Sequence, residues 1–227
     1  MKKIYLYTCF IFIGLVASLT SCEENDPFKD LGEVVSDKVP FVTTSGILNL
    51  YAADDSVLFN VFYWAAKDNI EKLSLGKGEQ VSVAGNILVD DGGGPVTVDI
   101  AFMIEKEIEQ EGADIPHDPL DYETARNAYN KAMIYHIGPE YQLLELEDPA
   151  NLGSIDDLAY AEEIKQNILD TLGLSGVQVA SWEELGNITT GIALKIESTL
   201  SFQMLVIDAE GQYNQSAITA VKVGAIE

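Results

Sequence analysis

The sequence predicts a mainly β protein (α+β overall) with a helical segment in its middle. Two observations point to this fold class. Strand-like runs of apolar residues lie on both sides of the middle, most clearly at 57–64 and 200–207. From about residue 113, the spacing of apolar residues changes from two, which is typical of strands, to 3.6, which is typical of helices.

The first part of the domain is expected to be all strand. The run 57–64 is apolar on both of its alternating faces, as is typical of a central strand. Residues 90–94 (DDGGG) are a strong turn signal. The expected strands are 41–44, 47–51, 57–64, 70–75, 80–89 and 95–104.

Helices are expected in the middle of the chain. Asp118 and Pro119 make a typical N-cap and first-turn pair, so we expect a helix from there to about Ile137, before Gly138-Pro139. An apolar stripe at helical spacing predicts a second helix over 154–173. Residues 181–184 repeat the capping-box pattern over one short turn.

Strands return at the C-terminal end, at 192–197, 200–207 and 217–223. The segment LSFQMLVIDAEGQYNQSAITAVKVG resembles the last two strands of immunoglobulin-like modules in bacterial surface proteins. This resemblance implies an immunoglobulin-like β-sandwich over residues 40–227, with an α-helical insertion at about 113–186. The alternative is a separate small helical domain.

The N-terminus has the layout of a secretory signal. Lys2 and Lys3 precede an apolar run over 4–19, which is shorter than the ~20 residues of a spanning helix. Leu19-Thr20-Ser21-Cys22 then resembles the lipobox of bacterial lipoproteins. This resemblance implies a signal peptide over residues 1–21 and lipidation of Cys22. An uncleaved anchor helix and an ordinary signal peptide are the alternatives.

Residues 22–39 are polar and acidic, and are expected to form a tether between the anchor and the domain. Their start, Glu23-Glu24-Asn25-Asp26, resembles the surface-export signal of Bacteroidota lipoproteins. That resemblance implies a protein of the outer membrane, lipid-anchored and exposed at the cell surface. A solvated acidic linker is the alternative.

Charge and cysteine content exclude several functions. Without residues 1–21, 11 basic residues face 37 acidic ones, a net charge of −26. Nucleic-acid binding requires a basic footprint, so no nucleic-acid partner is expected. Cys9 and Cys22 are the only cysteines, so the exported domain has no disulfide and no thiol nucleophile.

No sequence motif identifies a reaction. The nucleophile elbow, the H-E-x-x-H motif, the P-loop and the G-x-G-x-x-G motif are all missing. His136 is expected to be a hydrogen-bonded core residue beside Tyr129, and His117 lies in an acidic loop. A pair of carboxylates could hydrolyse a glycoside, but the sequence selects no pair among 37 acidic residues.

Weaker signals suggest ligand and metal sites. Trp182 and Tyr141, which are flanked by polar or turn residues, are expected to be exposed and to bind a ligand, together with Trp64. No cofactor is expected, although Ca²⁺ is compatible with the carboxylates. Its candidate ligands are Asp208, Glu210 and Asn214 in the last turn, or Asp90 and Asp91; neither set has the full calcium-loop spacing, and turns without an ion also explain both.

The favoured hypothesis is a non-enzymatic, lipid-anchored surface protein that binds a glycan or an outer-membrane protein. Its layout is similar to that of accessory lipoproteins in starch-utilisation-type nutrient-uptake systems. The alternatives are a carboxylate-dependent glycoside hydrolase and a structural or adhesive envelope lipoprotein.

Overall fold

The computed structural model describes residues 39–65, 69–90, 94–111, 114–125, 127–173 and 182–224. The expected signal peptide (1–21), the lipidation site Cys22 and the tether up to residue 38 therefore lie outside the described residues. Within the described part of the chain, no helix is long and apolar enough to cross a membrane. The fold is mainly β, as the sequence predicts.

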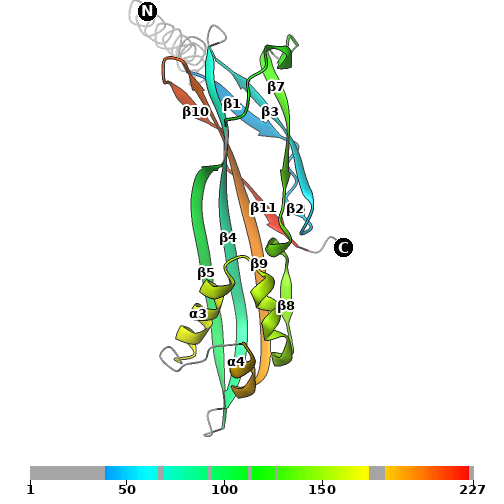
Figure 1. Ribbon diagram of the computed structural model, residues 1–227, viewed down its shortest axis with the longest axis vertical. Coiled ribbons are helices and arrows are strands. Elements are labelled where there is room, and N and C mark those ends of the chain that lie inside the picture. The colour runs from blue at the N-terminus through cyan, green and yellow to red at the C-terminus, as the bar shows by residue number, and fades with distance from the viewer. Residues whose placement is uncertain are drawn as a thin grey trace, which may run out of the picture.

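Three long antiparallel strands run along the molecule and form the central part of its larger sheet (Figure 1). They are β4 (Ile70–Asp90), β5 (Pro95–Glu111) and β9 (Thr189–Asp208). One edge of β9 pairs with β4, and its other edge pairs in succession with three short strands. These are β8 (Leu144–Leu146), β11 (Thr219–Val223) and β10 (Tyr213–Gln215); β2 (Leu50–Tyr51) then pairs with β11.

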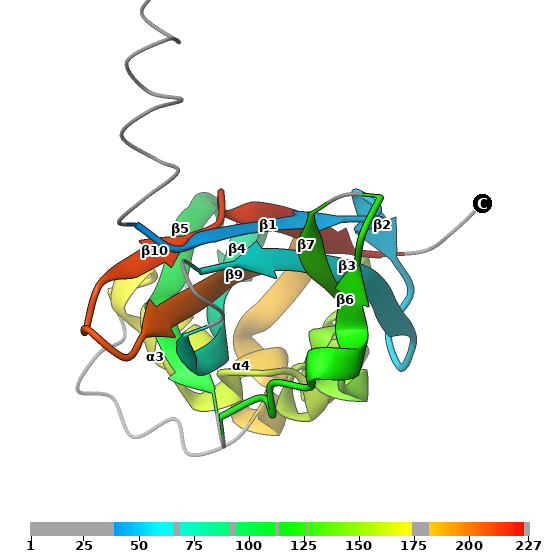
Figure 2. The ribbon, with the colours of Figure 1, turned by 90° about the horizontal axis from the view of Figure 1, so that it is seen from above.

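A second, four-stranded antiparallel sheet covers the upper end of the long strands (Figures 1 and 2). Its order is β1 (Phe41–Ser45), β3 (Ser56–Trp64), β7 (Ala128–His136) and β6 (Tyr122–Glu123). Tyr63 and Tyr129 from this sheet and Phe202 from β9 are among the fully buried side chains between the two sheets. We call this the upper core.

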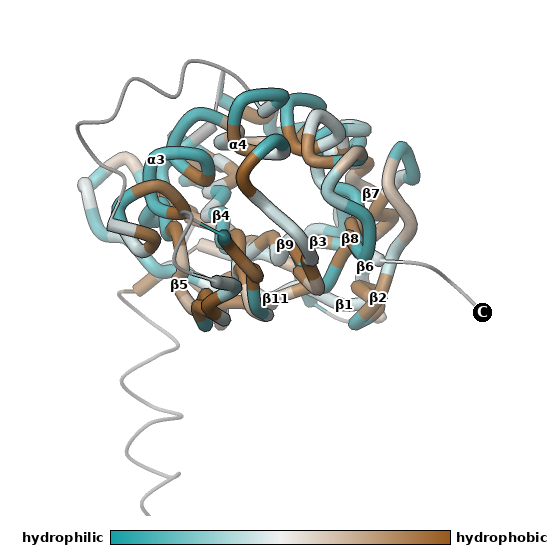
Figure 3. Tube along the Cα trace, turned by 90° about the horizontal axis from the view of Figure 1, so that it is seen from below, coloured by the Kyte–Doolittle hydropathy of each residue, from teal (hydrophilic) through white to brown (hydrophobic). Residues whose placement is uncertain are grey.

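Helices cover the same face of the long strands at the lower end. They are the 3₁₀ helix η4 (Pro149–Asp157) and the α-helices α3 (Ala161–Thr171) and α4 (Trp182–Ile188). Figure 3 shows α3 and α4 on one side of the molecule and β5 and β11 on the other. Ile155, Ile168 and Leu185 from the helices pack with Val83 and Ile196 from the strands, and we call this the lower core. Two short 3₁₀ helices lie in connections between strands: η2 (Pro119–Asp121) between β5 and β6, and η3 (Pro139–Tyr141) between β7 and β8.

The two cores share strands but are separated by a polar layer. Side chains alternate between the two faces of a strand, so odd-numbered residues of β4 and even-numbered residues of β9 face inward. Between the two cores these inward rows hold Lys77, Glu79 and Ser198 in place of apolar residues. We call this layer the waist.

The helix expected over 118–137 is wrong, and so is the helical character of the first part of the 113–186 insertion. Asp118 does cap a helix, since its carboxylate accepts from the Leu120 N–H at 2.9 Å, but only the 3₁₀ helix η2 follows. Strands β6 and β7 come after it in the chain, and β7 pairs with β3 at eight successive positions. Tyr129, Met133 and Tyr135 suit the inner face of a sheet, and this pairing prevails over the helical spacing of the alanines.

Two further boundaries differ from the sequence expectation. The helix expected over 154–173 begins only at Ala161. Tyr160, just before it, is in the left-handed conformation (φ 62°), so η4 and α3 do not form one continuous helix. The strands expected at 70–75 and 80–89 are one continuous strand, β4. The four residues between them, Gly76 to Glu79, are paired with β9 like their neighbours.

Candidate functional site

Two of the three expected ligand-binding aromatics are buried, so the prediction of their exposure is wrong. Trp182 is 5% exposed; its indole N–H donates to the Asp156 carboxylate, and Lys165 Nζ lies 5.4 Å from the ring centre. Tyr141 is 7% exposed and faces the waist. Trp64, at the end of β3, is half-buried. Ligand binding by these residues stays a prediction.

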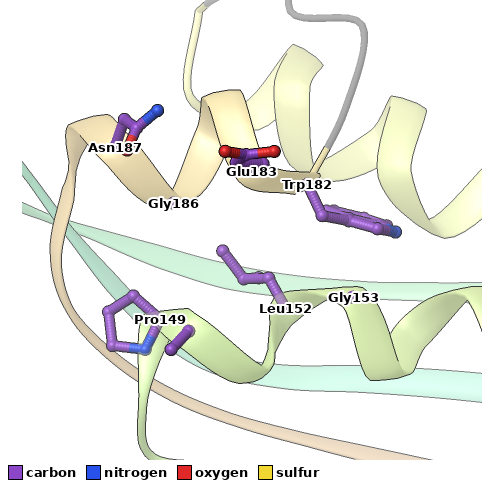
Figure 4. A pocket seen from close by; sticks show the side chains of 8 residues that line it. Pro149, Leu152, Gly153, Trp182, Glu183, Gly186 and Asn187 are labelled. Carbon is purple, nitrogen blue, oxygen red and sulfur yellow. The ribbon is translucent and has the colours of Figure 1, made fainter.

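A depression lies beside Trp182, between η4 and α4 (Figure 4). It measures about 410 Å³ and forms where Gly153 and Gly186 leave room between the two helices. Leu152 and Trp182 supply its apolar part, and Glu183 and Asn187 its polar part. Since Trp182 and Leu152 are bound into the lower core, this depression offers little free aromatic surface.

The expected calcium ligands form a turn. The buried carboxylate of Asp208 accepts from the backbone N–H groups of Glu210 at 3.1 Å and Gln212 at 2.8 Å. Glu210 accepts from the Asn69 amide at 2.7 Å, and Asn214 pairs with Val206 on β9. Among the described residues, which exclude Asp91, no three His, Cys, Asp or Glu side chains are grouped to hold a metal. Calcium binding stays a prediction.

The two histidines have different surroundings. His136 was expected in the core, and this is wrong: it is exposed, with Nε2 3.3 Å from Asp54 and Nδ1 3.3 Å from the Ser56 hydroxyl. His117 packs edge-on against Tyr63 and Tyr129, and its Nδ1 lies 3.3 Å from the Tyr63 hydroxyl.

The waist contains a largely buried ion pair. Lys77 Nζ lies 2.6 Å from Glu79 Oε1, and the two side chains are only 15% and 13% exposed. The Glu79 carboxylate also accepts from the hydroxyls of Tyr160 and Tyr141. Burial alone would raise the pKa of Glu79, but the hydrogen bonds from Lys77 and the two tyrosines prevail and lower it.

The waist therefore holds its protons in place at neutral pH. Burial, and then the bond to Glu79, raise the pKa of both Tyr141 and Tyr160. The Glu79 carboxylate therefore stays ionised and the two hydroxyls stay protonated at neutral pH. Tyr141 comes from η3 and Tyr160 from the start of α3, so the network links segments beside the two cores. We interpret it as a structural clamp.

A groove of about 640 Å³ lies on the outer face of the long sheet at the level of the waist. Its floor consists of three small residues in register across neighbouring strands. Ser201 on β9 pairs with Gly78 on β4 and with Ala220 on β11. Since none of the three carries a long side chain, the sheet surface is lowest along this line.

A β-bulge builds one wall of the groove. The β4–β5 pairing shifts between Lys77 and Glu79, so that two β5 residues, Glu107 and Ile108, stand opposite Gly78. The Ile108 side chain then lies over β4, at Gly76 and Gly78. A Cβ atom at Gly78 would be 2.9 Å from Ile108 Cγ1, and one at Gly76 would be 2.7 Å from Ile108 Cγ2. Glycine is required at both positions for this wall to form.

Uncharged polar side chains form part of the groove lining. Hydroxyls and amides on its surface come from Gln80, Thr199, Ser201, Gln203 and Gln215. Gln203 is held in place, since its Nε2 donates to the Ser216 carbonyl at 3.1 Å. The acidic lining residues are Glu105 and Glu107 on β5 and Glu79 on β4. A glycosidase needs carboxyl groups on both sides of the scissile bond. Glu105 and Glu107 lie on one wall, and the Glu79 carboxylate is already bonded to Lys77, Tyr141 and Tyr160.

Comparisons with known proteins identify no family. No family model matches the chain, and no curated protein matches it. Among solved structures, it is similar to Spo0M, a sporulation control protein from Bacillus subtilis (TM-score 0.26, 5% identity, 83% of this chain and 50% of that chain). The chain thus spans about half the length of Spo0M. It is also similar to AvmM, which catalyses macrocyclization in alchivemycin A biosynthesis (TM-score 0.21, 8% identity, 85% and 92%). Likenesses this weak support no argument about function.

The sequence held signals for the groove and the waist that composition alone does not reveal. Thr199, Ser201 and Gln203 alternate with Leu200, Phe202 and Met204, which predicts a strand with one polar face. Gly76-Lys77-Gly78-Glu79 places two glycines and two charges between the apolar residues Leu75 and Val81. Glycine within a strand often marks a bulge or a close approach, as it does here.

Proposed function

We propose that the protein is a lipid-anchored binding protein of the bacterial outer membrane, exposed at the cell surface, and that it binds a glycan in the groove of the long sheet. The anchor rests on Leu19-Thr20-Ser21-Cys22 and the acidic residues that follow. The two-sheet packing of the upper half supports classing the domain as an immunoglobulin-like sandwich. The observation that carries glycan binding is the groove itself.

The groove suits a sugar chain chemically. Each sugar hydroxyl both donates and accepts hydrogen bonds, and so do the side chains of Thr199, Ser201 and Gln80. Ile108 and Ile218 add apolar surface for the C–H faces of the rings. A solvent-exposed, hydrogen-bonding groove without an opposed pair of acids binds a glycan without cleaving it.

Filling the floor tests this proposal. The detergent-solubilised full-length protein is screened on a glycan array, beside the variants Ala220→Tyr and Ala84→Tyr. Both alanines are exposed, but Ala220 is part of the floor, while Ala84 lies outside the groove opposite Ala101. We expect Ala220→Tyr to weaken binding at least tenfold and Ala84→Tyr to leave it unchanged. Equal effects of both variants, or a wild-type protein that binds no glycan, contradict the proposal.

The location has its own test. Protease added to intact cells is expected to digest the protein, and Cys22→Ser is expected to release it from the membrane fraction. Full protection of the protein on intact cells would rule out surface exposure.

A further inference from the structure

We infer that the groove selects a neutral or amine-bearing oligosaccharide and rejects glycans rich in carboxylate or sulfate. This inference rests on the proposed function and adds the substrate class. It depends on the charges of the groove and on the length of its floor.

The β5 wall of the groove is negatively charged. Glu105 and Glu107 are exposed and line this wall. The basic residue between them, Lys106, does not offset their charge inside the groove, since its ammonium is directed elsewhere. Its Nζ lies 3.1 Å from Glu163 on α3 and 5.2 Å from the centre of the Tyr160 ring, both on the inner side of the sheet. A carboxylate or sulfate at this wall would meet two like charges without a counter-ion.

The opposite side offers one counter-charge at the rim. Lys222 on β11 is exposed and pairs with Thr199 in the backbone register. It does not line the groove. The next lysine on the outer face of β9, Lys195, is 3.1 Å from Glu197 and is neutralised by it. The formal charge of the whole chain, −24, further repels anions and attracts cations over a longer range.

The length of the floor favours an oligosaccharide. The line of small residues runs across the strands rather than along them, from the β5 wall over Gly78 and Ser201 to Ala220. Ile108 covers the step from β5 to β4. Neighbouring strands are about 4.8 Å apart, so the two open steps from β4 to β11 span roughly 10 Å. A single sugar ring occupies only part of this length, and a short chain lying across the strands fills it.

The glycan array tests the inference when its results are sorted by charge and chain length. We expect the full-length protein to bind neutral and amine-bearing oligosaccharides at least tenfold more tightly than uronate-containing or sulfated ones. Monosaccharides are expected to bind more weakly than oligomers of the same sugar. A preference for anionic glycans overturns the inference and leaves the proposed function intact, whereas a complete lack of glycan binding overturns both.

A double variant assigns the selectivity to the wall. Glu105→Gln/Glu107→Gln keeps the shape of the wall and removes its charge, so we expect it to reduce the discrimination against anionic glycans at least fivefold. Asp99→Asn is the control, because Asp99 is exposed on the same strand and lies outside the groove lining. If the double variant discriminates as well as the wild type, or if Asp99→Asn loses as much selectivity, the wall is not the cause.

Discussion

The upper and lower halves of this molecule are built on the same strands with different partners. In the upper half, β4 and β9 pack against a second sheet, and in the lower half they pack against η4, α3 and α4. Both halves use the same inward row of apolar residues on each strand. An apolar strand face therefore does not determine whether a sheet or a helix covers it. The secondary structure of the segments that pack on that face decides it.

What divides the halves is the waist. The apolar rows stop at Lys77, Glu79 and Ser198 and then resume. A buried ion pair contributes little net stability but costs several kcal/mol when one partner is removed. The waist thus separates two hydrophobic cores while the continuous hydrogen bonding of β4, β5 and β9 joins them.

The largest effect is expected from truncating a core side chain in the upper half. Phe202→Ala removes a ring that is 2% exposed and packs against Phe59 and Tyr135, so we expect the free energy of unfolding to fall by about 3–5 kcal/mol. Denaturation in urea measures it. Phe41→Ala, at a position 40% exposed, is the control and should cost far less.

The same variant tests whether the halves are coupled. The protein has two tryptophans, Trp64 in the upper half and Trp182 in the lower half. Trp64→Phe and Trp182→Phe each leave one fluorescent reporter. Since β4 and β9 are continuous through the waist, we expect Phe202→Ala to lower the midpoint equally for both reporters. A shift seen by Trp64 alone would show that the halves unfold independently.

A somewhat smaller effect is expected at the waist. Glu79→Gln removes the carboxylate that lies 2.6 Å from the largely buried Lys77 ammonium, which we expect to cost about 3 kcal/mol. Adding Lys77→Met to this variant removes the buried ammonium as well, and the double variant should recover a large part of the loss. If Lys77→Met gives no recovery, the charge pair is not what holds the waist.

The pH dependence of the waist follows from the lowered pKa of Glu79. A carboxyl whose folded pKa lies below its unfolded value adds stability at higher pH and loses it as the pH falls through the folded pKa. The ordinary value is 4.5, so the contribution is complete above about pH 4.5 and fades below it. We expect the stability gap between wild type and Glu79→Gln to be constant from pH 7 to 5.5 and to narrow in more acidic solution. A constant gap down to pH 3 would contradict the lowered pKa.

The smallest effect is expected for Tyr160→Phe. It removes one of the hydrogen bonds to Glu79 and leaves Lys77 and Tyr141 in place, so we expect a loss of about 1–2 kcal/mol. Tyr122→Phe is the matched control, since its hydroxyl bonds to the exposed Asn127 amide at 2.6 Å and lies away from the waist. If Tyr160→Phe and Tyr122→Phe lower the free energy of unfolding equally, the hydrogen bond in the waist contributes no more stability than a bond at the surface.

The mainly β class and most of the strands could be predicted from the sequence, because alternation with a period of two is a local signal. Strand β7 could not, because Ala128 and Ala132 fit a helix as well as a sheet, and only pairing with β3 decides between them. The Tyr160 hydroxyl likewise bonds to Glu79, which is 81 residues away, so no local pattern shows this contact. Trp182 was misplaced for the same reason: its partner Asp156 comes from another helix.

The groove was harder to predict than the fold. Its floor combines Gly78, Ser201 and Ala220 from three strands, and no single segment of sequence shows that they are in register. The polar alternation of β9 predicts an exposed face, but not a hollow one. The hollow arises from the bulge opposite Gly78, which depends on two strands at once.

The position of β5 has a consequence for the solubility of the protein. In the described part of the chain β5 pairs only with β4, so a 17-residue strand is left as the edge of the long sheet. A long unpaired edge invites a strand of another molecule to add to it and start aggregation. Here the edge begins with Pro95 and carries charges at Asp99, Glu105, Glu107 and Glu109. Like-charged edges repel one another, which opposes pairing between the β5 edges of two copies.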